Sequence, residues 1–310
     1  MTLIMGLQVL TEKGVKNKTL FNLHQTRGFL IACEYGLKDL VQFLMTDMTF
    51  NISAKSKGLF WACKGGQKEI VLLMINKAKI GNCLRFFDWN EGLNGACLGG
   101  HIELALLMIN KGATDMDNGL NRTCLGGHQE LAQLMIKQGA INFNEGLENA
   151  CLGGHTELAL LMITQGANEW NEGLNKACLG GHLKLALLMI KKGAKNFNEG
   201  LENACAGGHT KLAVLMIIQG SKLKNDHKKT SGYHLTIDDF NNGLNSACEC
   251  GHKELVLLMI QNGATELNMG LVGAFQNNHY DIASLLVAKG ANSKIYDDCF
   301  KNPSSVRLLL

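Results

Sequence analysis

The sequence predicts an all-α fold, built as a stack of helix–turn–helix repeats, and three observations support this prediction. A glycine marker and a histidine marker each return every 27 residues between Asn90 and Gly220. Each copy contains two apolar patterns with helical spacing, and a pair of glycines separates them. A unit this short cannot bury its own apolar face, so neighbouring units must stack and share one core. The markers are Gly92, Gly119, Gly146, Gly173 and Gly200, and His101, His128, His155, His182 and His209.

The first regular copy reads N-E-G-L-N-G-A-C-L-G-G-H-I-E-L-A-L-L-M-I-N-K-G-A, residues 90–113. Leu93, Ala96 and Cys97 follow an i, i+3, i+4 spacing, which places them on one side of a short first helix. Gly99 and Gly100 should end that helix, because glycine supplies the left-handed backbone of a helix end and destabilises a helix interior. A second helix with a wide apolar arc should then run to Gly112.

The run A-C-L-G-G-H-I-E-L-A-L-L-M-I-N-K-G-A, residues 96–113, resembles the ankyrin repeat. It departs from that family where E-G-L-N stands in place of T-P-L-H. The period is also 27 rather than 33 residues, so about six residues of the usual β-hairpin are missing. Tandem units with the pattern N-x-G-L-x-x-A-C-x-G-G-H resemble the short ankyrin repeats of giant DNA viruses. The resemblance implies an ankyrin-like helix-turn-helix solenoid with mostly trimmed β-hairpin fingers.

The array is expected to have three parts. Residues 1–27 should form an N-terminal cap made of half a repeat, with its helix near Val9–Val15. Residues 28–296 should hold about nine repeats, with an insertion near 222–240. Residues 297–310 should form a C-terminal cap, and the repeat before it is atypical, as terminal repeats are, because Phe275 replaces the cysteine.

Composition excludes several classes of protein. The net charge of +3 is too small for the basic stripe of a nucleic-acid-binding domain, and no run of about 18 apolar residues could span a bilayer. The amino-terminal residues lack the features of a signal peptide. Six of the 11 cysteines occupy one repeat position on a buried helix face, which indicates reduced core residues. We therefore expect a monomeric, intracellular, cytoplasmic protein, or one in the cytoplasm or nucleus of a host if viral.

The repeated C-x-x-x-H pair, Cys97 with His101 in the first copy, is the strongest candidate for a metal site or a catalytic site. A thiolate and an imidazole four residues apart could bind zinc on one continuous helix turn. The two glycines interrupt that turn, so the histidine is predicted to be a hydrogen-bonding turn residue. Equivalent buried thiols are poor nucleophiles. With no phosphate-binding loop either, the sequence predicts no metal, no cofactor and no enzymatic activity.

A row of leucines is the predicted contact surface. Leu98 lies on the first helix away from its core side, and an exposed apolar row would mark a binding site. The alternative is that the return loops cover the row. Polar residues beside it vary between copies while the framework stays constant. The predicted partner-binding residues are Leu98, Leu125, Leu152 and Leu179, the neighbours Asn94, Arg122, Glu148 and Lys176, and Lys228 and Lys229 of the insertion.

Two further features each have two interpretations. One large apolar residue precedes each copy, and these residues either fill the space of the missing β-hairpin or form an exposed ladder for binding. The polar, basic segment 222–232 is either a binding loop or extra length without consequence. The residues of the first set are Trp89, Met116, Phe143, Trp170 and Phe197.

The resulting hypothesis is a non-catalytic protein–protein interaction scaffold, which binds a partner protein through the concave face of its first helices and its loops. One alternative is a substrate adaptor for a ubiquitin ligase, since viral ankyrin proteins of this kind often carry a C-terminal F-box-like segment. Residues 297–310 are short for such a segment. The other alternative, a nucleic-acid or anionic-surface binder, would use the basic insertion and show steep salt dependence.

Overall fold

The computed structural model describes residues 18–47, 52–80, 87–224 and 235–295, which contain eighteen α-helices and no strand. They divide into two compact units, Met1–Asn142 and Phe143–Leu310. The predicted all-α helix–turn–helix fold is confirmed. The first unit contains α2 (Lys18–Glu34), α3 (Lys38–Asp47), α4 (Ile52–Lys64), α5 (Lys68–Ile80), α6 (Trp89–Gly99), α7 (Ile102–Lys111), α8 (Met116–Gly126) and α9 (Gln129–Lys137).

The second unit is built in the same way from ten helices. They are α10 (Phe143–Gly153), α11 (Thr156–Thr164), α12 (Trp170–Gly180), α13 (Leu183–Lys192), α14 (Phe197–Gly207), α15 (Thr210–Lys224), α16 (Ile237–Cys250), α17 (Lys253–Gln261), α18 (Leu267–Gln276) and α19 (Tyr280–Ala288).

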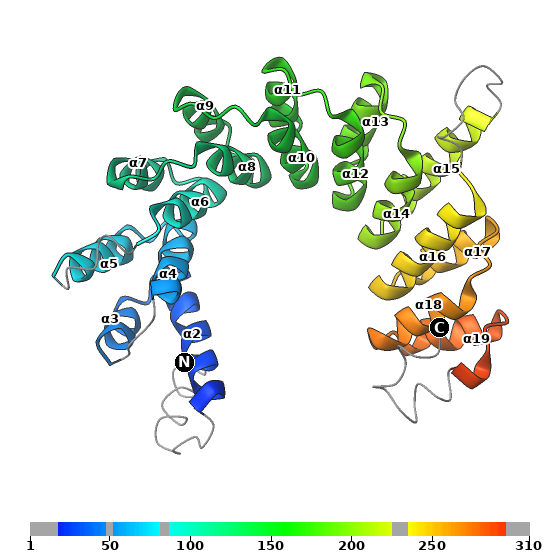
Figure 1. Cartoon of the computed structure of the whole chain (residues 1–310), viewed down its shortest axis with the longest axis horizontal. Coiled ribbons are helices and arrows are strands. Elements are labelled where there is room, and N and C mark those ends of the chain that lie inside the picture. The colour runs from blue at the N-terminus through cyan, green and yellow to red at the C-terminus, as the bar shows by residue number, and fades with distance from the viewer. Residues whose placement is uncertain (1–17, 48–51, 81–86, 225–234, 296–310) are drawn as a thin grey trace. The chain divides into compact units, whose positions relative to one another are not determined.

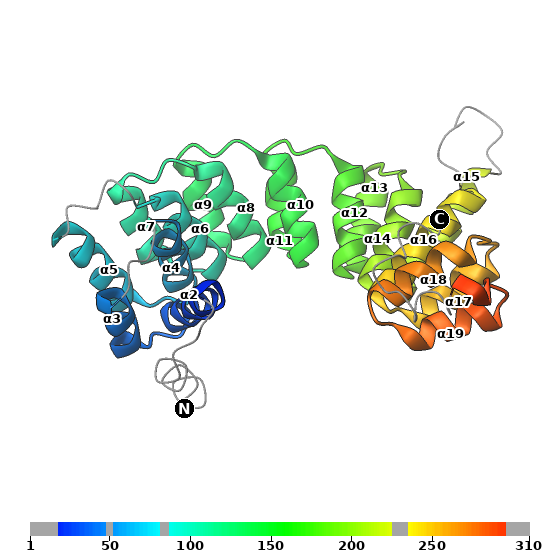
Figure 2. The same ribbon diagram turned by 60° about the horizontal axis from the view of Figure 1, so that its bottom comes forward.

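Each unit has two layers of helices (Figures 1 and 2). The even-numbered helices are the first helices of the repeats, and within a unit each packs on the next even-numbered helix. Each odd-numbered helix packs against the even-numbered helix that precedes it. This pairing is the packing that the repeated sequence predicts, because no repeat buries its apolar face alone.

The core lies between the two layers. Leu93, Ala96 and Cys97 of α6 have no exposed surface, and Leu104, Ala105 and Met108 of α7 are buried with them. The same six positions are buried through the regular repeats. In α2 the buried residue at the Leu93 position is Phe29, and Leu30 is half-buried. Phe29, Ala32 and Cys33 reproduce the i, i+3, i+4 spacing of the regular repeats.

The two glycines of each turn have different roles. Gly100 has a φ of 83°, the left-handed conformation predicted for a helix end. Gly99 is still helical, so the expectation that both glycines are left-handed is wrong. The reason for a glycine there is close approach: at the equivalent Gly126, a Cβ atom would lie 2.5 Å from the Leu98 carbonyl oxygen of the preceding repeat. The turn therefore needs glycine for two separate reasons.

The insertion lengthens the two helices on either side of it. Helix α15 continues to Lys224, and α16 begins at Ile237. A capping box fixes the start of α16: the Thr236 side chain accepts a hydrogen bond from the Asp239 amide, and the Asp239 carboxylate accepts one from the Thr236 amide. Lys228 and Lys229 lie outside the described residues.

The last described repeat has its own core residues. Phe275, at the cysteine position, is buried with Val272, and Ile295 packs against them. The Tyr280 ring meets Phe275 edge-to-face at a centroid distance of 5.3 Å. Asn278 takes the left-handed conformation that glycine takes elsewhere, with a φ of 65°. Residues 18–27, which were assigned to the N-terminal cap of residues 1–27, belong to α2. The expected Val9–Val15 helix and the C-terminal cap, residues 297–310, lie outside the described residues.

Candidate interaction surface

The repeated histidines connect consecutive repeats. The His101 Nε2 lies 3.1 Å from the carbonyl oxygen of Lys64 in the preceding repeat, and His128, His182, His209, His252 and His279 make the same contact at 3.0–3.1 Å. A carbonyl oxygen can only accept, so Nε2 carries the proton and donates. This agrees with the prediction of a hydrogen-bonding turn residue.

The cysteine and the histidine of one motif face different neighbours. His101 bonds to the preceding repeat, whereas the Cys97 Sγ lies 3.8 Å from the Met135 Sδ in the following repeat. The two side chains therefore do not converge on one site. Within the described residues, no group of three or more His, Cys, Asp or Glu side chains is arranged to hold a metal ion.

The buried thiols are chemically inert at neutral pH. Burial raises the pKa of Cys151 to about 12 and that of Cys97 to about 11, from an ordinary value of 9.0. Because the thiolate is the nucleophilic form, these side chains offer no reactive sulfur. Cys250 is the exposed cysteine among those described.

A second inter-repeat contact was not predicted from the sequence. The Asn90 Oδ1 accepts hydrogen bonds from the Thr114 and Asp115 amides of the return that leads to the next repeat, at 2.8 and 3.0 Å. Five further residues at this position accept from one or two amides in the same way: Asp117, Asn144, Asn171, Asn241 and Asn268. We call this contact the asparagine clamp. In the sequence, the sign of this contact is an Asn or Asp that recurs two residues before the marker glycine of each copy.

The large apolar residue of each copy is the first residue of a first helix, not part of the return. Trp89, Met116, Phe143 and Trp170 are half-buried, and Phe197 is buried. The Trp89 ring stacks on Phe87 at a centroid distance of 5.5 Å. These positions favour the space-filling interpretation over a fully exposed aromatic ladder.

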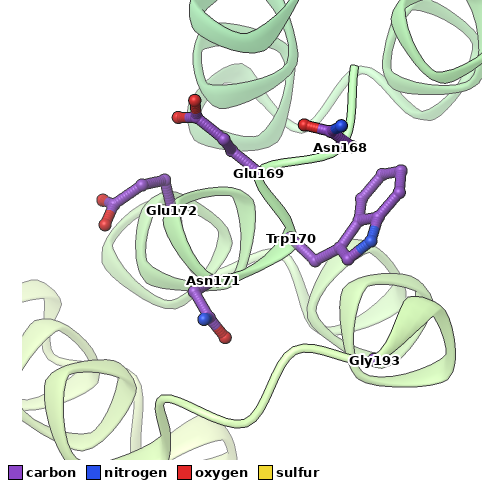
Figure 3. Close-up of a pocket in the computed structure, with 6 residues that line it drawn as sticks. All are labelled: Asn168, Glu169, Trp170, Asn171, Glu172 and Gly193. Carbon is purple, nitrogen blue, oxygen red and sulfur yellow. The ribbon is translucent and has the colours of Figure 1, made fainter. Parts of the chain in front are cut away.

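A pocket of about 390 Å³ surrounds the start of α12 (Figure 3). The Trp170 indole extends toward the end of α13 at Gly193, and the Lys192 Nζ lies 5.8 Å from the ring centroid. The Glu169 and Glu172 side chains extend away from the Trp170 indole. Because the indole and the carboxylates do not point toward one another, the pocket lacks the convergent groups of a small-molecule site.

The predicted leucine row is half-buried. Leu98 and Leu125 of the first unit, and Leu152 and Leu179 of the second, each keep part of their side chain in solvent. The carbonyls of Leu98, Leu152 and Leu179 face the next repeat, where they accept the histidine bonds described above. The row is thus neither fully open nor fully covered, and its role in binding stays a prediction.

The polar neighbours of the row differ in exposure. Arg122 is exposed, and Glu148 and Lys176 are half-buried. Asn94 is half-buried and its Oδ1 has no hydrogen-bond partner among the described residues. Its equivalent Asn121 is buried, so the helical position of Asn94 faces partly inward. The partner-contact role of Asn94 also stays a prediction.

Glu148 lies in an electrostatically unfavourable place. Burial raises the pKa of its carboxyl above the ordinary range, and the neighbouring carboxylates Glu172, Glu169 and Glu145 raise it further. Lys176 acts in the opposite direction. The first helices α10 and α12 therefore present a negative region with one lysine inside it.

Together these contacts define a class: a helical repeat protein in which constant side chains join the repeats and varied side chains remain at the surface. No family model matches the chain, and no curated protein matches it in sequence. A solved structure to which it is similar is that of the human ASB11 ankyrin repeat domain, with 21% identity over 56% of this chain and 84% of that chain, and a TM-score of 0.38. A likeness this low carries no argument about function.

None of the helices in the described parts of the chain combines the length and the apolar character needed to cross a bilayer.

Proposed function

We propose that the protein is a non-catalytic scaffold that binds a partner protein through the first helices of its repeats and the adjoining loops. The observation that carries the proposal is that constant side chains join the repeats, whereas varied side chains remain at the surface. The constant histidine, asparagine and cysteine of each copy face neighbouring repeats. The varied residues, such as Arg122 and Lys176, retain solvent exposure beside the half-buried leucines.

The surroundings of Glu148 support a partner of a particular kind. Its charge is opposed by burial and by three neighbouring carboxylates, and Lys176 offsets part of this effect. A basic side chain of a partner would offset that repulsion, and apolar side chains could cover Leu152 and Leu179. Affinity in such surfaces comes from a few anchors, with the remaining contacts supplying complementarity. A partner with a mixed basic and apolar surface therefore fits the second unit.

The test uses substitutions that the chain itself already accepts. Gln276 occupies the position of Leu152 and Leu179 in α18, so Leu152→Gln with Leu179→Gln should fold without adding charge beside Glu148. Leu160→Gln, on the exposed side of α11, makes the same change elsewhere and is the control, since Gln133 occupies that position in α9. Each full chain is used as bait in a lysate of the cells that express it, and bound proteins are quantified by mass spectrometry.

We expect one stoichiometric protein partner with the unmodified chain and with the control, and its loss with the double variant. Circular dichroism should show equal helicity in all three chains. A partner retained by a folded double variant would contradict the proposed surface. Recovery of nucleic acid in place of protein would contradict the function.

A further inference from the structure

The second helices of the second unit carry a more exposed apolar surface than the leucine row. Leu183 and Leu187 of α13 are 39% and 46% exposed, and Val214 and Ile218 of α15 are 38% and 48% exposed. Helices α13 and α15 belong to consecutive repeats and contact each other. Packed helices lie roughly 8–10 Å apart, so these side chains form one patch. An exposed apolar patch of this kind marks an interaction site.

Lysines border this patch at helical spacing. Lys184, Leu187 and Lys191 are three and four residues apart on α13, and Lys211, Val214 and Ile218 repeat that spacing on α15. Helices α13 and α15 contain no Asp or Glu residue. They also contain no aromatic residue. We call the four apolar side chains and Lys184, Lys191 and Lys211 the basic-apolar face.

The charge of this face reverses that of the other repeats. The seven other described second helices have an acidic residue at the position of Lys184 and Lys211, in the first turn of the helix. An acidic residue there is favoured by the helix dipole, and a lysine is disfavoured. The acidic residues are Asp39, Glu69, Glu103, Glu130, Glu157, Glu254 and Asp281.

Ion pairs within the chain do not account for the reversal. Glu69, Glu103 and Asp281 each pair with a lysine of the preceding second helix, at 2.7–3.8 Å. In the part of the chain that the structure describes, Lys184, Lys191 and Lys211 have no ion pair. Residues that break a local rule without gain inside the fold are expected at functional sites.

We propose that the basic-apolar face binds an acidic amphipathic helix of a partner protein. Apolar side chains of that helix would cover Leu187, Val214 and Ile218, and carboxylates on either side would meet the lysines. Single-stranded nucleic acid is bound by basic grooves with stacking aromatic side chains, and neither helix has an aromatic residue. Helices that lie on bilayers bury their whole apolar face among the lipids, whereas the side chains of this face are already about half-covered by the protein.

The probe is a fluorescein-labelled synthetic helix with leucines along one face and glutamates on both sides of them. The control peptide has the same composition with the leucines distributed around the helix. Binding of each peptide to the full chain is measured by fluorescence anisotropy. We expect the amphipathic peptide to bind more tightly than the control peptide, because only the former presents leucines and carboxylates together.

Variants of the chain test each half of the face. Lys184→Glu with Lys211→Glu gives α13 and α15 the charge found in the other seven second helices, so the fold should persist. It should weaken peptide binding by roughly tenfold or more, since attraction becomes repulsion. Leu187→Gln copies Gln133, which occupies this position in α9, and should also weaken binding. Leu106→Gln in α7, next to Glu103, is the matched control and should have no effect.

Equal binding of the amphipathic peptide by the unmodified chain and the charge-reversed variant would overturn the proposal. So would equal binding of both peptides, or tighter binding of single-stranded DNA or phosphatidylserine vesicles at the same lysines. The inference is independent of the proposed function, because the Leu152→Gln, Leu179→Gln chain should still bind the acidic peptide.

Discussion

The His128 imidazole donates a hydrogen bond from Nε2 to the Leu98 carbonyl oxygen, 3.1 Å away in the preceding repeat. Leu98 lies in the last turn of α6, where helix carbonyls have no partner within the helix. The turn of one repeat thus satisfies the helix end of its neighbour. The same ring also covers Gly100, where an added Cβ would lie 2.6 Å from the imidazole.

Replacement of His128 should therefore weaken the stack. We expect His128→Ala to lower the free energy of unfolding by about 1–3 kcal/mol, because a helix-end carbonyl loses its partner and packing over Gly100 is lost. Urea denaturation followed by circular dichroism measures the change. Zinc chloride should leave the melting temperature of the unmodified chain unchanged, since the histidine and cysteine of a motif face different repeats. An unchanged urea midpoint in the variant would contradict the structural role.

Asn171 allows a test of the asparagine clamp with a matched control. Its Oδ1 accepts from the Lys195 and Asn196 amides at 2.8 and 3.2 Å. Asn171→Ala removes the acceptor and should cost about 1–2 kcal/mol of unfolding free energy. Asn171→Asp keeps an acceptor oxygen, as Asp117 does at the equivalent position, and should be close to neutral.

Hydrogen exchange gives a local readout of the same clamp. The Lys195 and Asn196 amides should lose protection in Asn171→Ala and keep it in Asn171→Asp. Unchanged protection of both amides in the alanine variant would show that the clamp does not hold the return in place.

The buried cysteines should make the protein sensitive to alkali. Their pKa values are raised by burial from 9.0 to about 12, or about 11 for Cys97. Above pH 9 the unfolded chain releases these protons and the folded chain keeps them, so stability falls as pH rises through that window. Below pH 9 the thiols add no pH dependence. The residues are Cys33, Cys63, Cys97, Cys124, Cys151, Cys178, Cys205 and Cys248.

Each of these thiols can contribute up to about 1.4 kcal/mol of lost stability per pH unit above pH 9. Urea midpoints measured at pH 8 and pH 10 should therefore differ strongly. Cys151→Ala should reduce that difference by the contribution of one thiol to the loss of stability between pH 8 and pH 10. The substitution should also lower stability at both pH values. An equal pH response in the two chains would show that the Cys151 thiol does not stay protonated on folding.

The last described repeat should depend on Phe275. The ring is buried with Val272 and meets Tyr280 edge-to-face. We expect Phe275→Ala to cost about 3 kcal/mol, through lost transfer free energy and the cavity left behind. Because repeats interact with their neighbours only, the loss should appear first as faster hydrogen exchange in α18 and α19. Simultaneous, equal loss of protection in α10 and α11 would contradict this local effect.

The fold could be predicted because its signals are local. Helical spacing placed Leu93, Ala96 and Cys97 in the core, and the double glycine located the turn and the role of the histidine. The asparagine clamp could not be predicted in the same way, since Asn90 looks like an ordinary surface residue until the return of the next repeat is beside it. The prediction for Gly99 was wrong because a glycine is required there by the close carbonyl of the preceding repeat, which the sequence of one repeat does not show.

Exposure of apolar residues was the least predictable property. In the run L-A-L-L-M-I, the wide apolar arc gives no sign that Leu106 and Leu187 face solvent while Met108 and Met189 are buried. Leu98 was expected to be either open or covered and is half-buried. Which side of a helix remains free depends on packing between repeats, and a single-repeat pattern does not contain that information.

Among the regular repeats, the bonds between repeats have a constant separation along the chain: 24 and 25 residues for the clamps, and 30 for the histidines. The His101 bond to Lys64, in a longer early unit, spans 37 residues. Where the insertion intervenes, the His252 bond to Ala206 spans 46 residues with the same 3.1 Å geometry. Excision of residues 171–197 would join Trp170 to Asn198 and restore the sequence W-N-E-G at the start of the repeat. The length of this array can therefore change by duplication or loss of one coding block, with every remaining junction already complementary to its new neighbour.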